Sequence, residues 1–133
     1  MRFPHIMELH PEPIGVDRDA LVHCIEECLD CGTSCTACAD ACVAERDVQE
    51  MVHCIRLCLD CAEACASTGR IVARQTSPDL TVMRAAIEAC AVACGASAEE
   101  CERHAAHHEH CRVCAEQCRH CKGACEVLLA AIG

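Results

Sequence analysis

Cysteine spacing is the feature that most restricts what this sequence can fold into. The chain of 133 residues contains 18 cysteines, in four groups whose successive members are three, four or seven positions apart. Steps of three and four keep side chains on one stripe of an α-helix. The spacing therefore predicts four helices, each lined along one face by thiols. The groups are Cys24, Cys28, Cys31, Cys35, Cys38 and Cys42; Cys54, Cys58, Cys61 and Cys65; Cys90, Cys94 and Cys101; and Cys111, Cys114, Cys118, Cys121 and Cys125.

Residues that favour helix starts precede three of these groups. Asp17 is a suitable cap for the first helix, and Asp47, with Glu50 three positions later, resembles a capping box for the second. Ser77 before Pro78 suits the start of the third helix. Because the connections are short, neighbouring helices must run antiparallel. The predicted spans are about 18–44, 48–75, 78–106 and 109–131.

The predicted fold is therefore all-α, an antiparallel up-down-up-down four-helix bundle with a cysteine-lined core. We expect the bundle to occupy residues 17–133 as one metal-storage domain, after a flexible N-terminal segment of residues 1–16. The chain has no Trp or Tyr and one Phe, so it lacks the usual large core residues. A single buried Cys often acts only as a small apolar residue. A core of 18 thiols would be underfilled, which predicts that metal ions occupy the space.

Composition also limits the compartment and the partners. The first 15 residues contain no apolar run of the kind found in signal peptides, and no later segment resembles a membrane span. We therefore expect a cytoplasmic protein without a membrane partner, in which thiols stay reduced and favour metal over disulfides. The formal net charge is -10, and the 11 basic residues are scattered, which argues against a nucleic-acid partner.

Charge and ligand type favour Cu(I) among the possible metals. Each zinc ion with four thiolates leaves two negative charges, so several such sites would leave the buried core strongly charged. A Cu(I) ion that replaces one thiol proton leaves the charge of the core unchanged, and this soft ion suits thiolates. The alternatives that remain are a store for zinc or another soft metal, and a thiol-disulfide redox protein that would use Cys111 and Cys114.

The two ends of the predicted bundle differ in composition. One end collects apolar residues that would close it, namely Leu21, Val72, Leu80, Met83, Ile87, Leu128 and Ile132. The other end collects Met51, His104 and His108 beside cysteines, and we expect these three to join the thiols as metal ligands. Four other histidines at helix positions are expected to face solvent, namely His23, His53, His110 and His120.

The complete pattern resembles the cytosolic branch of the copper storage protein family. The resemblance is carried by the "HCIEECLDCGTSC" and "HCIRLCLDCAEAC" units, by "CTACADAC" ending at Cys42, and by "HEHCRVCAEQCRHC" ending at Cys121. It implies a homotetramer of bundles, each holding many Cu(I) ions. We also expect a copper chaperone or chelator as the donor. We expect no enzymatic role, because the sequence shows no acid/base pair and no nucleophile with a positioned base. The cysteine pattern is interrupted at Ser97, where the third stripe would continue, and at Thr68, where the second stripe stops.

Overall fold

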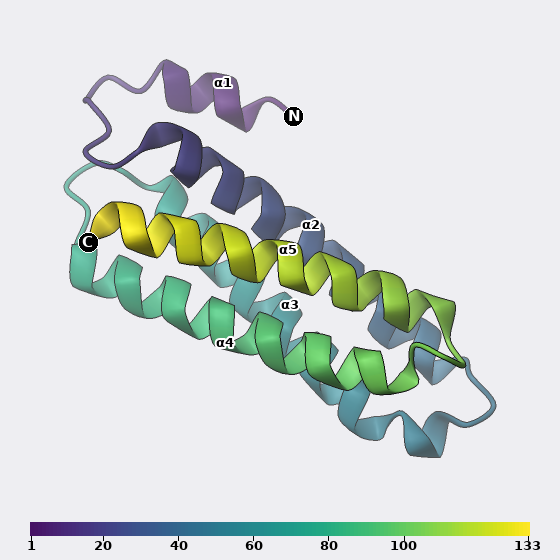
Figure 1. Cartoon of the computed structure of the whole chain (residues 1–133). Helices are drawn as coiled ribbons and strands as arrows, with labels where there is room; N and C mark the ends of the chain where they lie inside the picture. The colour runs from purple at the N-terminus through teal and green to yellow at the C-terminus, as the bar shows by residue number, and fades with distance from the viewer.

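Four long helices carry the cysteine stripes in the computed structural model, which describes residues 1–133. They lie side by side and run antiparallel in chain order, as Figure 1 shows. α2 packs against α3 and α5, and α4 packs against the same two helices. The predicted up-down-up-down bundle is therefore confirmed. The helices are α2 (Arg18–Val43), α3 (Val52–Ala73), α4 (Leu80–His104) and α5 (Glu109–Ile132).

The start of α2 is capped as predicted, whereas the start of α4 is not. The Asp17 carboxylate accepts a hydrogen bond of 3.1 Å from the Ala20 backbone N–H. The α4 cap is Asp79, whose carboxylate accepts a 3.0 Å bond from the Val82 N–H, so the assignment of this cap to Ser77 was wrong. Ser77 instead has a φ of 50°, a left-handed conformation that belongs to a turn. The helix therefore begins two residues later than expected.

The start of α3 also differs from the prediction. Residues Val48–Glu50 form a short 3-10 helix, η1, and α3 begins only at Val52. Asp47 makes no side-chain capping bond there, because its carboxylate lies 3.0 Å from His108 Nε2 on the other connection at this end. The capping box predicted from Asp47 and Glu50 was therefore wrong. A tertiary contact between two connections has replaced a local one.

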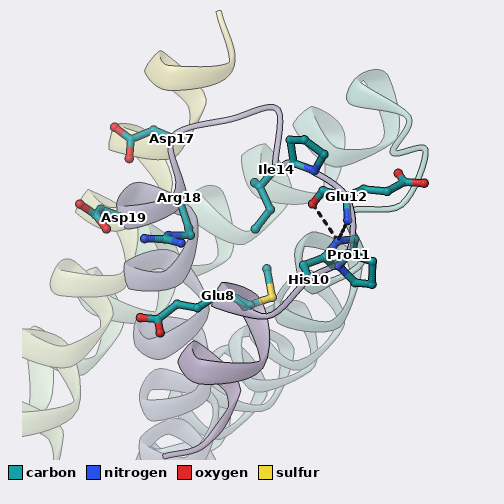
Figure 2. A pocket seen from close by; sticks show the side chains of 10 residues that line it. Glu8, His10, Pro11, Glu12, Ile14, Asp17, Arg18 and Asp19 are labelled. Atoms are coloured by element: carbon teal, nitrogen blue, oxygen red, sulfur yellow. Dashed lines mark hydrogen bonds between the residues drawn. The ribbon is translucent and has the colours of Figure 1, made fainter.

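The segment before the bundle contains a short helix, α1 (Phe3–Glu8), which lies along α2 (Figure 1). Its Met7 is buried. The turn after α1 is closed by a 3.1 Å hydrogen bond from the Glu12 N–H to His10 Nδ1. This turn and the first residues of α2 surround a surface pocket, whose lining side chains are drawn in Figure 2. The volume of the pocket is about 560 Å³.

The apolar end of the bundle is closed by aliphatic side chains that come from all four long helices. Leu21, Val72, Ile87 and Leu128 have no exposed surface, and Met83 is 2% exposed. Leu80 was expected to join them, but it is 43% exposed because it lies in the first turn of α4, beyond the packed layer. This end is called the plug below, and its residues are Leu21, Val72, Met83, Ile87 and Leu128.

α4 is long and apolar enough, by length and composition, to cross a membrane. The core helices of soluble proteins pass the same test, and α4 packs against α3 and α5 in the bundle. Its apolar character comes largely from alanine and from the cysteines that face the core. Cys90 Sγ lies 3.7 Å from Cys65 Sγ on α3, and Cys94 Sγ lies 3.6 Å from Cys61 Sγ. α4 thus forms one wall of the sulfur-lined core.

Because the caps and the plug do not involve metal, the chain without metal should already be helical. We expect the far-UV circular dichroism of the reduced, metal-free protein to show a helical spectrum, and thiol-binding metals to raise its melting temperature by binding the native state. A random-coil spectrum without metal would contradict this prediction and would indicate a chain that folds only around its ions.

Candidate metal centre

All 18 cysteines point into the centre of the bundle as free thiols. None of them has more than 3% of its surface exposed. The four cysteine stripes that the spacing predicts therefore all face the core. This burial supports the thiols as candidate ligands, and it leaves the middle of the core almost without aliphatic side chains.

Sulfur contacts cross the bundle in several directions. Cys35 Sγ on α2 lies 3.4 Å from Cys118 Sγ on α5. Contacts also join the diagonal helices, with 3.9 Å between the Cys65 and Cys121 Sγ atoms. These distances are those of thiols in van der Waals or weak hydrogen-bonding contact, and they are far longer than a disulfide bond of about 2.05 Å. The thiols therefore meet at the axis of the bundle.

The thiols form overlapping groups in which the ligand atoms lie within 4.8 Å of one another. Cys121 belongs to two groups, and so does Cys31. Shared members favour bridging thiolates over isolated sites, because each independent tetrahedral site would need four cysteines of its own. In order from the plug, the all-cysteine groups include Cys28, Cys90, Cys121 and Cys125; Cys31, Cys65, Cys94 and Cys121; Cys31, Cys35, Cys61 and Cys118; and Cys38, Cys58, Cys101 and Cys114.

Ser97 and Thr68, which interrupt the cysteine pattern, are both buried. Ser97 lies among the sulfurs, with its Oγ 3.5 Å from Cys118 Sγ and 3.8 Å from Cys58 Sγ. Thr68 donates a 3.1 Å hydrogen bond to the backbone carbonyl of Ala86. Ser97 therefore adds one oxygen to the sulfur column, whereas the hydroxyl of Thr68 is occupied by the backbone.

Neighbouring thiols shift one another's pKa values in opposite directions. A hydrogen bond from Cys114 to the Cys118 thiolate is the main cause that lowers the pKa of Cys118 to about 5. The pKa of Cys114 is raised, mainly through its hydrogen bonds with Cys101 and Cys118. Nearer the end of the bundle opposite the plug, which is called the open end below, burial raises the pKa of Cys111 to about 12. The thiols thus share protons with one another, and a soft cation would replace these protons.

At the end opposite the plug, the histidines predicted to be ligands contact carboxylates. His104 Nε2 lies 2.9 Å from Glu100 Oε2. His108 lies between Glu45 and Asp47, and its hydrogen bond with Asp47 is the main cause that raises the pKa of His108. Neither imidazole is bonded to a thiol in this structure. Met51 is fully buried where η1 meets α3.

His110 is a candidate ligand that the sequence analysis missed. Its Nδ1 lies 3.3 Å from Cys38 Sγ and 3.6 Å from Cys111 Sγ. It forms a group with Cys38, Cys42 and Cys111, so the expectation that it faces solvent was wrong. The overlooked signal is its position four residues before Cys114, which continues the stripe of α5 by one turn. His23, His53 and His120 are exposed, as expected.

Comparison with known proteins agrees with this arrangement. The family model described as copper storage protein matches residues 17–130. A copper storage protein from Streptomyces lividans, in a structure loaded with 10 copper equivalents, is 49% identical, with a TM-score of 0.95 over 97% of this chain and 98% of that one. A five-copper structure of that organism's cytosolic copper storage protein is 52% identical, with a TM-score of 0.86 over 86% of this chain and 96% of that one.

A sequence relative extends the similarity to a second organism. The uncharacterized cysteine-rich protein YhjQ of Bacillus subtilis is 36% identical over 107 residues, which span 80% of this chain and 94% of the relative. The matched region of the family model contains every cysteine described above. The cysteine-lined bundle and the family match together show that this chain belongs to the copper storage protein family.

Proposed function

We propose that this protein stores many Cu(I) ions in the cytoplasm, bound by the thiolates that line the core of residues 17–133. The observation that carries the proposal is the burial of 18 free thiols in contact along one continuous column. The Streptomyces lividans relative, a cytosolic copper storage protein, supports both the metal and the compartment. The ligands we propose are the 18 cysteines, joined by Met51, His104 and His108, and by His110, which the structure adds.

Copper suits the column better than zinc does. The overlapping thiol groups provide bridging ligands, which soft Cu(I) accepts readily. Separate zinc sites would require distinct sets of four ligands and would leave two negative charges at each site in a dry core. The alternative of a zinc or other soft-metal store is therefore the weaker candidate.

A redox enzyme is the weaker candidate from another class. Such a protein would use an exposed thiol with a lowered pKa. Cys111 is fully buried, and burial raises its pKa to about 12. Cys114 is 2% exposed, and its pKa is raised as well. This pair therefore suits metal binding better than disulfide exchange, and we propose a storage role without catalysis.

Assembly and supply of copper are also part of the proposal. Several apolar side chains lie on the outer faces of the helices, including Leu29 at 45% and Leu59 at 46% exposure. Contacts between copies would cover such residues, which supports the homotetramer implied by the family. Copper would be delivered by a chaperone or a small chelator that releases its ion at the end opposite the plug.

The first prediction of this function concerns capacity. If each Cu(I) replaces about one thiol proton, anaerobic titration of the reduced protein should saturate at on the order of 18 ions per chain. Bound metal and free thiols should be measured together, against a competing Cu(I) chelator. A plateau near four or five ions, with zinc bound equally tightly, would support the zinc alternative instead.

Proton release gives a second prediction. Burial keeps the Cys111 thiol protonated at neutral pH, since its pKa is about 12, so Cu(I) must displace that proton. Affinity for Cu(I) must therefore fall as the pH falls, because a lower pH supplies more protons to compete with the metal. Affinity of such sites should fall about tenfold for each unit of decreasing pH, measured by chelator competition between pH 6 and 8. Affinity independent of pH would show that the thiols are already ionised.

A third prediction concerns the end of the bundle at which Cu(I) enters the core. His104 and His108 lie at the open end, where imidazoles can accept Cu(I) one ligand at a time before the thiolates take it. Replacing both by Ala should slow loading, seen by stopped-flow absorption of Cu(I)-thiolate formation, and should cost at most one or two ions of total capacity.

The double variant His23→Ala with His120→Ala is the matched control, because both of these histidines are exposed on helix faces away from the core. It should load at the wild-type rate. If the control and the His104/His108 variant load equally fast, whereas a polar substitution at Leu128 speeds loading, copper enters through the plug and the assignment is reversed.

A further inference from the structure

Ser97 stands where the cysteine stripe of α4 would otherwise continue. Successive cysteines within each helix are three or four positions apart, except Cys94 and Cys101 on α4, which are seven apart. A rise of 1.5 Å per residue separates these two by about 10.5 Å along the helix, whereas the other neighbours are about 4.5–6 Å apart. α4 therefore leaves one level of the column without a thiol.

The hydroxyl of Ser97 occupies that level. Ser97 has no exposed surface, and its Oγ lies 3.5 Å from Cys118 Sγ, 3.8 Å from Cys58 Sγ and 4.0 Å from Cys35 Sγ. These three sulfurs belong to α5, α3 and α2. Each of the four helices thus supplies one atom to this layer, which contains three sulfurs and one oxygen.

A hydroxyl and a thiol differ in what they offer to Cu(I). The hydroxyl of serine is a hard donor that keeps its proton, whereas soft Cu(I) prefers thiolate sulfur. Once copper has replaced the protons of Cys58 and Cys118, the Ser97 O–H can donate a hydrogen bond to either thiolate. It does not bridge two copper ions. The layer at Ser97 therefore has three possible ligands, none of them on α4.

The interruption lies on the side of the column between α3 and α4. The Cys61 and Cys94 Sγ atoms are 3.6 Å apart on the plug side of Ser97. The Cys58 and Cys101 Sγ atoms are 3.6 Å apart on the side of the open end. Ser97, which is three positions after Cys94 and four before Cys101, separates these two pairs.

Sulfur contact continues past this level only on the opposite side of the column, between α2 and α5. Cys35 Sγ lies 3.4 Å from Cys118 Sγ and 3.7 Å from Cys114 Sγ. Copper ions move between thiolates that share them, so an ion that passes Ser97 would depend on these few thiolates. Passage across this level should therefore be slower than movement on either side of it.

We propose that Ser97 divides the stored Cu(I) into two groups that leave the protein at different rates, an inference that rests on the proposed storage function. Eleven thiols lie on the plug side of this division, and seven lie on the side of the open end. The division follows the thiol groups described above. It runs between Cys35 and Cys38 on α2, between Cys58 and Cys61 on α3, and between Cys114 and Cys118 on α5.

The competing interpretation is that Ser97 only fills space. The contacts of Cys35 with Cys114 and Cys118 would then be sufficient to join all the copper into one continuous cluster. In that case the ions would leave as a single population. The two interpretations therefore predict different kinetics for the removal of copper.

The test is removal of Cu(I) from the loaded, reduced full chain by an excess of the chelator bathocuproine disulfonate, followed anaerobically by absorption. At about one ion per thiolate, we expect about seven ions to leave in a fast phase and about eleven in a slow phase. Removal of all the copper from the wild-type protein in one phase would overturn the proposal.

Two substitutions at the same position assign the division to Ser97. Ser97→Cys should raise the capacity by about one ion and merge the two phases, because a thiolate at this level can bridge ions on both sides. Ser97→Ala should keep both phases and the wild-type capacity, because it removes no copper ligand. Two phases in Ser97→Cys with helical circular dichroism retained, or loss of an ion in Ser97→Ala, would overturn the proposal.

Thr68→Cys is the matched control. Thr68 is 2% exposed and follows Cys65 by three positions at the plug end of the α3 stripe. A thiol there would extend the plug-side group without crossing the division, so this variant should gain at most one ion and keep two phases. If its phases merge as in Ser97→Cys, any added thiol has that effect and the assignment to Ser97 is wrong.

The same measurements separate this inference from the storage function. Wild-type protein that binds no Cu(I) would refute the storage function, and the division would fall with it. Saturation at on the order of 18 ions, followed by removal in one phase, would refute the division alone.

Discussion

Contact between sulfur atoms across the axis of the bundle is the constraint on which the rest of this structure depends. Diagonal pairs such as Cys28 and Cys90, whose Sγ atoms lie 3.9 Å apart, leave no room for aliphatic side chains between the helices. A thiol contributes less apolar burial than a leucine, so the middle of the bundle adds less stability than an ordinary core. Stability of the empty chain must therefore come from the plug, the caps and the outer packing of helix against helix.

The two ends of the bundle differ in their chemistry. Aliphatic side chains from all four long helices close one end, where Leu21 and Leu128 have no exposed surface. Imidazoles and carboxylates occupy the other end and remain partly exposed. Because α2 to α5 run antiparallel, both connections at the open end bring their polar residues to the same place. The polar rim is thus a product of the topology as much as of the local sequence.

The sequence predicted the bundle and the inward thiols well, because a spacing of three and four has one geometric meaning on a helix. It predicted the connections poorly. Asp47 was assigned as a cap, but it bonds to His108, which lies 61 positions later in the chain. His110 was assigned to solvent, but its Nδ1 faces Cys38. Both errors arise where helices end, since side-chain direction there depends on the opposite connection and not on helical periodicity.

Because Leu128 and its neighbours close one end of the column, stored ions would exchange through the other end, and this would set the order in which they leave. The Cys24 and Cys125 Sγ atoms, 3.9 Å apart, form the deepest sulfur pair below the plug. Ions held there have every other ion between themselves and the solvent. The ions bound last would consequently leave first. Ions near the end opposite the plug would exchange readily, whereas ions next to the plug would leave last.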